Sequence, residues 1–194
     1  MHKGSNYTAY FNFINSIHPL SEDDFKHLFS FSNPTRCKPK TIFVEIGQKP
    51  NRMYLLVKGV VRSFVIMENG NEITKSLFAD MELCSPLTAL IKNEPSKFIF
   101  ESLTDCYVLE LNYKKFIELC NENIEILKLY VKYLEKIFIK NEEKHLEVLS
   151  KDAKDRYLDL RNRYPKIDNL IPQYQIAAYL NITPVQLSRI RSEI

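Results

Sequence analysis

The sequence predicts an α+β protein with an antiparallel β-roll, one long helix and a helical C-terminal part. Short β-rich runs separated by turn signals fill residues 35–111. A helical apolar pattern follows over residues 121–149, and two helices joined by a tight turn are predicted in the last 22 residues. The chain has 194 residues, of which 45% are hydrophobic and 26% charged, so it can form a folded core.

Residues 1–31 have a helical pattern. Ser21 is a predicted N-cap, because the acids of Glu22–Asp24 follow it and favour the first turn of a helix. The apolar residues after them have helical spacing: Phe25, Leu28 and Phe29.

The β-rich region predicts an antiparallel barrel or sandwich. Gly47, Gly59 and Asn69-Gly70 separate its runs, and Asn-Gly predicts a hairpin with a type I′ turn. A short helix is expected over Leu87–Ile91, between strands. The predicted strands are Thr41–Ile46, Met53–Val57, Val60–Met67, Glu72–Phe78, Phe98–Leu103 and Cys106–Leu111.

The long helix, with Asn121 as its expected N-cap, has apolar residues on two faces. One stripe follows steps of four and three: Leu127, Val131, Leu134, Phe138, Asn141, His145 and Val148. The other contains Ile126, Tyr130, Tyr133 and Ile137. One face can pack on the β domain and the other on the identical helix of a second chain. Such a dimer interface would contain Leu127, Val131, Leu134, Phe138 and the polar Asn141; the alternative is a helix buried within a monomer.

Positive charge is concentrated at the end of the chain. Residues 151–194 contain eight basic and five acidic residues, whereas residues 1–150 are balanced. This asymmetry indicates contact with an anion, although a solvated helical surface would have the same composition. Ser150 is expected to cap a helix over Lys151–Tyr164, which Pro165 ends.

The last 22 residues predict a helix-turn-helix. Asn181 suits the left-handed turn, and Thr183, Pro184 and Gln186 form a Thr-x-x-Gln capping box with proline at the first helical position. Small and apolar residues are spaced to pack the two helices together: Ile176, Ala177, Leu180, Ile182, Leu187 and Ile190. An ordinary αα-hairpin is the alternative.

Residues 183–194 would be the recognition helix of a protein that binds double-stranded DNA. Arg189 can bind a guanine edge, and Thr183 at the helix N-terminus suits a phosphate. The predicted contact residues are Thr183, Val185, Gln186, Ser188, Arg189 and Arg191. Further backbone contacts are expected from Lys151, Lys154, Arg156, Arg161 and Arg163.

Other functional classes find little support. The four cysteines, Cys37, Cys84, Cys106 and Cys120, have no metal-ligand spacing with one another or with the four histidines. No catalytic motif or glycine-rich phosphate loop occurs, so we expect no enzyme activity, no metal and no cofactor. The absence of a long apolar run and of a signal-peptide pattern predicts a cytoplasmic protein without a membrane partner.

The whole pattern resembles the Crp/Fnr superfamily of bacterial transcription regulators. The resemblance rests on Gly47, on the strand–glycine–strand run Met53–Arg62, on the Asn69-Gly70 hairpin and on C-terminal motifs. Those motifs are Asp155-Arg156-Tyr157, Ile171-Pro172 and Leu187–Arg191. It implies a cyclic-nucleotide-binding-like jelly roll with its N-terminal helix over 1–120, a dimerisation helix over 121–149 and a DNA-binding domain over 150–194. It also implies a homodimer on a near-palindromic site.

The chain departs from this family at the phosphate-binding cassette. Aligned from Asp80, the family's glycine falls on Leu83, its ribose-binding glutamate on Cys84 and its phosphate-binding arginine near Ser96. Without that arginine a buried phosphodiester lacks its cation, and Lys92 or Lys97 offers only a point charge. The degenerate effector pocket would comprise Leu83, Cys84, Ser96 and Lys97. The clustered four-cysteine ligation of oxygen-sensing relatives is also absent.

These observations predict a dimeric DNA-binding transcription regulator of the Crp/Fnr type that does not respond to cyclic AMP. The β-roll would then bind an unknown small-molecule effector or serve as a scaffold. The alternative is a ligand-binding sensor with a cyclic-nucleotide-type pocket and weak or vestigial DNA binding.

Overall fold

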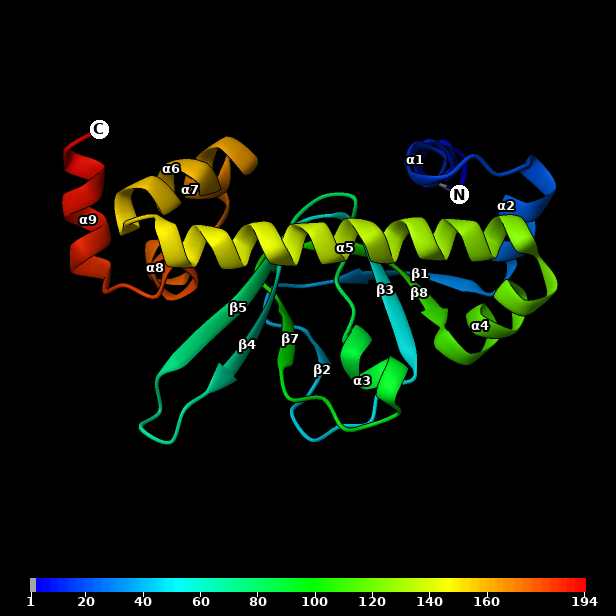
Figure 1. Ribbon diagram of the computed structural model, residues 1–194, viewed down its shortest axis with the longest axis horizontal. Helices are drawn as coiled ribbons and strands as arrows, with labels where there is room; N and C mark the ends of the chain where they lie inside the picture. Colours follow the sequence, from blue (N-terminus) through cyan, green and yellow to red (C-terminus); the bar gives the residue numbers. More distant parts are fainter. Residues whose placement is uncertain (1–2) are drawn as a thin grey trace.

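The computed structural model describes residues 3–194, so Met1 and His2 of the expected N-terminal helical region lie outside the described residues. The long helix α5 (Ile124–Ser150) runs along the whole molecule (Figure 1). The N-terminal helices lie at one of its ends, the C-terminal helices at the other, and the strands lie between them. None of the helices in this part of the chain is long and apolar enough to cross a membrane.

Two four-stranded antiparallel sheets confirm the predicted β-roll. Their strand orders are β1-β8-β3-β6 and β2-β7-β4-β5. Between them lies an apolar core that includes Val44, Leu56, Val61, Phe100 and Val108. The strands are β1 (Ser32–Cys37), β2 (Ile42–Val44), β3 (Arg52–Lys58), β4 (Val61–Ile66), β5 (Glu72–Phe78), β6 (Glu82–Leu83), β7 (Ile99–Ser102) and β8 (Cys106–Asn112). The sequence patterns did not predict β1 or β6.

The hairpin between β4 and β5 is confirmed, but its predicted turn type is wrong. Only Gly70 has a positive φ, of 79°, whereas a type I′ turn needs two such residues. The Gly70 N–H donates to the Met67 carbonyl, and the Met67 N–H donates to the Asn71 carbonyl, both at 2.8 Å. The loop therefore has three residues. The Asn69 side chain accepts from the Asn71 N–H at 3.0 Å, a bond between an asparagine side chain and the backbone two residues on that is typical of turns.

Gly59 is required where β3 turns into β4. Its φ is +113°, a conformation that other residues rarely adopt. A Cβ atom here would lie 2.6 Å from the Cys106 sulfur and 2.7 Å from the Asp105 carbonyl oxygen. The strand–glycine–strand motif thus marks a place where two parts of the backbone approach closely.

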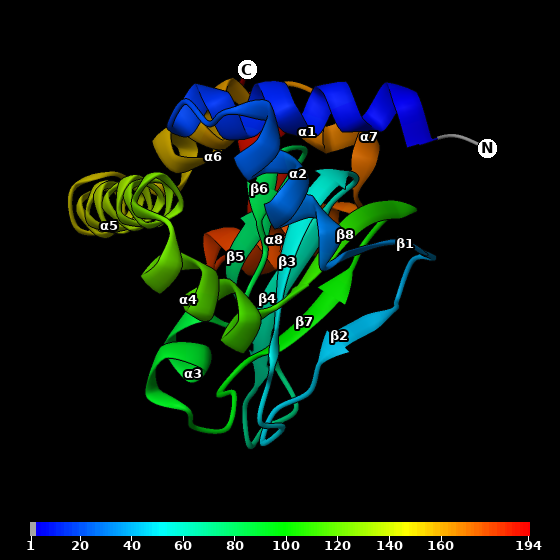
Figure 2. The same cartoon turned by 90° about the vertical axis from the view of Figure 1, so that its right-hand side faces the viewer.

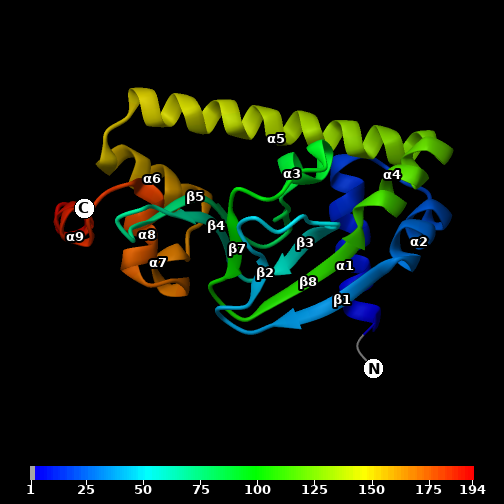
Figure 3. The same cartoon turned by 90° about the horizontal axis from the view of Figure 1, so that it is seen from below.

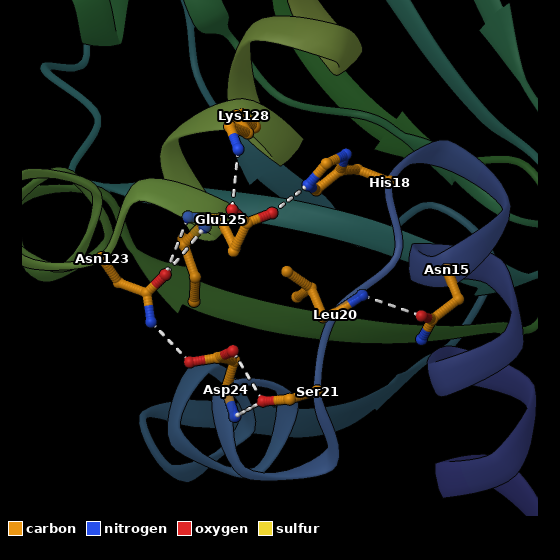
Figure 4. A network of polar contacts seen from close by, with 9 residues as sticks. Asn15, His18, Leu20, Ser21, Asp24, Asn123, Glu125 and Lys128 are labelled. Atoms are coloured by element: carbon orange, nitrogen blue, oxygen red, sulfur yellow. Dashed lines mark hydrogen bonds and ion pairs between the residues drawn. The ribbon is translucent and has the colours of Figure 1, made fainter.

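The N-terminal helices α1 (Lys3–Ile17) and α2 (Glu22–Ser30) are fastened to the start of α5. Figure 4 shows the contacts: the His18 ring nitrogen lies 2.8 Å from a Glu125 carboxylate oxygen, and the Asn123 amide donates to Asp24 at 2.5 Å. Ser21 caps α2, as predicted, by accepting from the Asp24 N–H at 3.1 Å.

Two predicted N-caps are corrected. Asn123 caps α5 by accepting from two backbone N–H groups, while Asn121 lies inside the preceding helix α4 (Tyr113–Glu122). Likewise Asp152 caps α6 (Ala153–Arg163), and Ser150 is the last residue of α5. The short helix predicted between strands is confirmed as α3 (Leu87–Lys92).

The C-terminal helices pack on the β-roll. They comprise α6, α7 (Ile167–Leu170), α8 (Gln173–Leu180) and α9 (Pro184–Ser192). Their core includes the fully buried Ile176 and Leu187, and it also contains Val60 and Leu77 from the β-roll. The two parts of the chain therefore share one continuous apolar cluster.

Candidate functional site

A cavity of about 420 Å³ lies where the β-roll meets α5 and the C-terminal helices. Such a volume is within the usual range for small-molecule sites. Of the predicted effector-pocket residues, Leu83, Ser96 and Lys97 line this cavity. Cys84 does not line it: its side chain is fully buried in the β-roll core, with its sulfur 3.6 Å from the Tyr54 carbonyl oxygen. Burial raises the pKa of the Cys84 thiol far above its ordinary range.

On the cassette side of the cavity, two polar groups form hydrogen bonds within the protein. The Leu83 N–H donates to the Tyr133 hydroxyl of α5 at 2.9 Å. The Ser96 hydroxyl donates to the Phe98 carbonyl at 2.7 Å, and Ser96 is only 3% exposed. Lys97 is exposed. At this end, a backbone donor already bonds to a tyrosine, and the one arginine among the described residues that line the cavity, Arg163, comes from α6 rather than from the cassette.

The opposite end of the cavity contains a cluster of cations from three elements. Lys75 comes from β5, Lys140 and Lys144 from α5, and Arg163 from the end of α6. The Lys144 ammonium donates to the Lys75 carbonyl and lies 4.2 Å from the centre of the Tyr179 ring. Burial, together with the charges of Arg163, Lys75 and Lys140, lowers the pKa of Lys144 to about 8.

Two carboxylates neutralise part of this cluster. Glu82 accepts from Lys140 at 2.6 Å and from the Tyr164 hydroxyl at 3.2 Å. Glu147 pairs with Arg163 at 2.5 Å. Within residues 3–194, neither Lys75 nor Lys144 has a carboxylate within 4.0 Å. The Lys75 ammonium lies instead 4.5 Å from the centre of the Phe98 ring.

Sequence reasoning missed this cluster. One signal was present, because Lys136, Lys140 and Lys144 recur every four residues and so share one face of α5. Lys75 and Arg163 gave no local signal, since only the fold brings them to that face. Arg163, which was expected to contact a DNA backbone, lines the cavity in this structure and is paired with Glu147.

The C-terminal helices have the geometry expected of a helix-turn-helix. Asn181 ends α8 in the left-handed conformation, with φ 55° and ψ 46°. Thr183 caps α9 in a reciprocal box with Gln186, and Pro184 stands at the first helical position. Leu187 is fully buried between the helices. These local features are as the sequence predicted.

Most of the predicted DNA-contact residues of α9 are open to solvent, whereas the Gln186 side chain bonds to its own helix cap. Thr183, Ser188 and Arg189 are exposed, and Val185 is 61% exposed. The Gln186 side chain is turned back, and its oxygen accepts from the Thr183 N–H at 2.8 Å.

Arg191, another predicted DNA-contact residue, is directed partly toward its own domain. Its side chain is 31% exposed, and a guanidinium nitrogen lies 3.6 Å from Asp168. Three other basic residues of this region are also paired with acids of their own domain: Lys151 with Asp159, Lys154 with Glu193, and Arg161 with Asp168.

A buried arginine joins the β-roll to α8. Arg62 of β4 is 4% exposed and donates to the Gln175 side-chain oxygen of α8 at 3.0 Å. It also pairs with Glu72 at 2.5 Å and with Glu101 at 2.7 Å. Gln175 is itself 3% exposed, so the position of α8 is fixed by a satisfied polar contact inside the shared core.

The two apolar stripes of α5 have different environments. Ile126 is fully buried, and Tyr130, Tyr133 and Ile137 are partly buried against the rest of the chain. The other stripe faces outward: Leu127, Val131 and Phe138 are 37%, 44% and 66% exposed, Leu134 is half-buried, and Asn141 is exposed. Figures 2 and 3 show α5 at the edge of the molecule, with one side against the other elements and one side free.

Among residues 3–194, no group of three or more His, Cys, Asp or Glu side chains is placed to hold a metal ion. The four cysteines are free thiols, all buried.

The β-roll is similar to a known protein family. Residues 34–123 match the family profile described as a cyclic nucleotide-binding domain. Similar curated proteins include the cAMP-activated global transcriptional regulators CRP of Salmonella typhimurium and Pasteurella multocida, each 25% identical, over 109 and 112 residues. The alignments cover 56% and 58% of this chain and 52% of each relative. The chain thus matches about half the length of these curated relatives.

Solved structures match most of the chain. The c-di-GMP responsive global regulator CLP of Xanthomonas campestris has a TM-score of 0.69 at 15% identity, covering 89% of this chain and 91% of its own. FixK2 from Bradyrhizobium japonicum has a TM-score of 0.68 at 16% identity, covering 84% of this chain and 83% of its own. At these identities the likeness shows a shared fold.

Proposed function

The chain has a cyclic nucleotide-binding domain and the fold of the Crp/Fnr regulators, and from this premise we propose that it is a dimeric, sequence-specific DNA-binding transcription regulator. The observation that carries the proposal is α9: a capped helix with an exposed Val185, Ser188 and Arg189, packed on α8 across a left-handed turn. This is the shape that a recognition helix needs in order to enter the major groove.

Arg189 is the residue we assign to base recognition. It is exposed, and no ion pair within the described residues holds its guanidinium against the protein. A free guanidinium fork can bind the O6 and N7 atoms of guanine. Thr183 and the start of α9 would contact a phosphate, because a helix N-terminus favours an anion.

The outer stripe of α5 supports the homodimer. Three apolar side chains spaced along one face, Leu127, Val131 and Phe138, are left substantially open to solvent. Pairing with the same stripe of a second copy would bury them, with Leu134 and Asn141 in the same seam. Residues 1–120, 121–149 and 150–194 would then act as sensor domain, dimerisation helix and DNA-binding domain. A regulator of this bacterial type would work in the cytoplasm, where the chromosome lies.

The β-roll would influence DNA binding through the junction it shares with α8. Arg62 and Gln175, together with the common apolar core, make the position of the helix-turn-helix depend on the β-roll. An effector acts only if it binds two arrangements of this junction unequally. We further propose that cyclic AMP is not this effector. Among the described residues, the cassette segment that follows Asp80 has no arginine to pair with a cyclic phosphate, and the Leu83 N–H already donates to the Tyr133 hydroxyl.

The experiment compares Arg189→Ala with Arg36→Ala, an exposed arginine of β1 that serves as a matched control. Loss of a bidentate base contact should weaken specific DNA binding by about 1–3 kcal/mol and relax the preference at one base position. Arg36→Ala should leave both unchanged. Unaltered affinity and base preference in Arg189→Ala would refute the assignment.

The second candidate function, a ligand sensor with weak DNA binding, is favoured by the cavity of about 420 Å³. Calorimetry with cyclic AMP and cyclic GMP distinguishes the two candidate functions. Binding in the micromolar range would overturn the proposed lack of response to cyclic nucleotides.

A further inference from the structure

Two lysines at the cationic end of the cavity, the exposed Lys75 and the half-buried Lys144, have no carboxylate within 4.0 Å among residues 3–194. Lys75 and Lys144 both approach an aromatic ring, at 4.5 and 4.2 Å from the ring centres of Phe98 and Tyr179. The nearby carboxylates Glu82 and Glu147 are engaged by Lys140 and Arg163. The cluster therefore has more positive than negative charge where side chains are partly shielded from water.

This arrangement is unfavourable for the empty protein. Lys144 is half-buried, and the charges of three neighbouring cations, Arg163, Lys75 and Lys140, oppose its protonation. Nearby rings compensate in part, because an ammonium is attracted to an aromatic face. A bound anion would compensate far more, since it would pair with cations that now repel one another.

We propose that this end of the cavity binds the doubly charged phosphate group of a small phosphorylated ligand, held by Lys75 and Lys144 with Arg163 beside them. Lys75 and Lys144 together call for two negative charges at this end of the cavity. A terminal phosphate group supplies nearly two at neutral pH, because its second pKa is about 6. A cyclic phosphodiester has a single charge and would leave one lysine unpaired.

The position of the site gives it a regulatory consequence. Lys75 belongs to the β-roll, Lys144 to α5, and Arg163 to the C-terminal helices. A phosphate group bound by all three would join the sensor domain to the DNA-binding domain at their junction. This consequence rests on the proposed regulator function, whereas binding itself does not.

The test uses the full chain with inorganic pyrophosphate as the probe and dimethyl phosphate as the singly charged comparison. Calorimetry should show one saturable pyrophosphate site per chain. NMR of the lysine side chains should show the Lys144 pKa rising from about 8 when pyrophosphate binds, by about one unit or more. Dimethyl phosphate should cause no such rise.

Variants locate the site. Lys144→Met and Lys75→Ala should each weaken pyrophosphate binding by about tenfold or more, as expected for loss of a charge-assisted contact. Lys132→Ala, an exposed lysine on the same helix with no place in the cavity, should leave binding unchanged. Since Lys144→Met removes a repelled cation, it should fold and melt at a higher temperature than the wild type.

The proposal would be overturned if the pKa of Lys144 did not change when pyrophosphate is added. It would also be overturned if Lys132→Ala lost as much binding as Lys144→Met. No DNA is present in these measurements. Their failure is therefore distinguishable from failure of the regulator function.

Discussion

Phe138 should be the side chain whose loss most weakens the α5 dimer. It is 66% exposed in the single chain and stands in the middle of the outer stripe. Full burial of such a side chain contributes about 1.5–3 kcal/mol, and a two-fold dimer buries it twice. Because two thirds of each side chain is open to burial, Phe138→Ala should destabilise the dimer by about 2–4 kcal/mol. That corresponds to a rise of about 30-fold to 1,000-fold in the dimer dissociation constant.

Sedimentation equilibrium over a range of protein concentrations measures this constant directly. Ile46→Ala, an apolar change at a residue that follows β2 and is 52% exposed, is the control and should leave the constant unchanged. The thermal stability of the monomer should not change in Phe138→Ala, since the side chain packs on little of its own chain. A wild-type protein that stays monomeric, or a dimer that tolerates Phe138→Ala as well as Ile46→Ala, would refute the reasoning.

Three further predictions concern stability. The pKa of Lys144 in the folded state, about 8, lies below its unfolded value, so the unfolded chain binds this proton more strongly between these values. The Lys144 contribution to stability should therefore rise as pH increases from about 8 to 10, by about 1–2 kcal/mol after allowance for solvent screening. Urea titrations should show this contribution as a change with pH in the difference between the unfolding free energies of wild type and Lys144→Met, since the buried cysteines, whose pKa is raised, titrate in both proteins. Gly59→Ala should lower the free energy of unfolding by about 2 kcal/mol or more, because its Cβ would lie 2.6 Å from the Cys106 sulfur. Gly47 also has a positive φ, but a Cβ atom there would meet nothing within 4 Å. Denaturant titration of Gly59→Ala and Gly47→Ala therefore distinguishes the cost of the clash from the cost of the positive φ. Thr183→Ala should lose about 1 kcal/mol through its cap, measured by thermal unfolding, and an unchanged melting temperature would contradict the capping box.

Local features were predictable where a short segment determines them. The capping box of Thr183 and the left-handed Asn181 were both predicted, because each depends on a few neighbouring residues. The cap of α5 was misplaced since Asn121 and Asn123 are equally good N-caps by composition. The strand β1 was missed because its sequence, Ser32–Cys37, is polar and only its last residue is buried.

Features that depend on tertiary structure were not predictable in the same way. Cys84 and Leu83 are adjacent in the sequence, yet one points into the β-roll core and the other lines the cavity. The cation cluster joins Lys75, Lys144 and Arg163, which lie far apart in the chain and meet only after the C-terminal helices pack on β5. The sequence pattern of a single segment cannot predict contacts between distant segments.

The proposed function requires that this chain binds specific DNA sequences as a dimer. Fragments bound by the purified protein can be selected from a random DNA pool at two salt concentrations. We expect them to share a two-fold motif with half-sites about one helical turn apart, with an affinity that falls steeply as salt rises. Selected fragments without a shared motif at either salt concentration would contradict the proposed function.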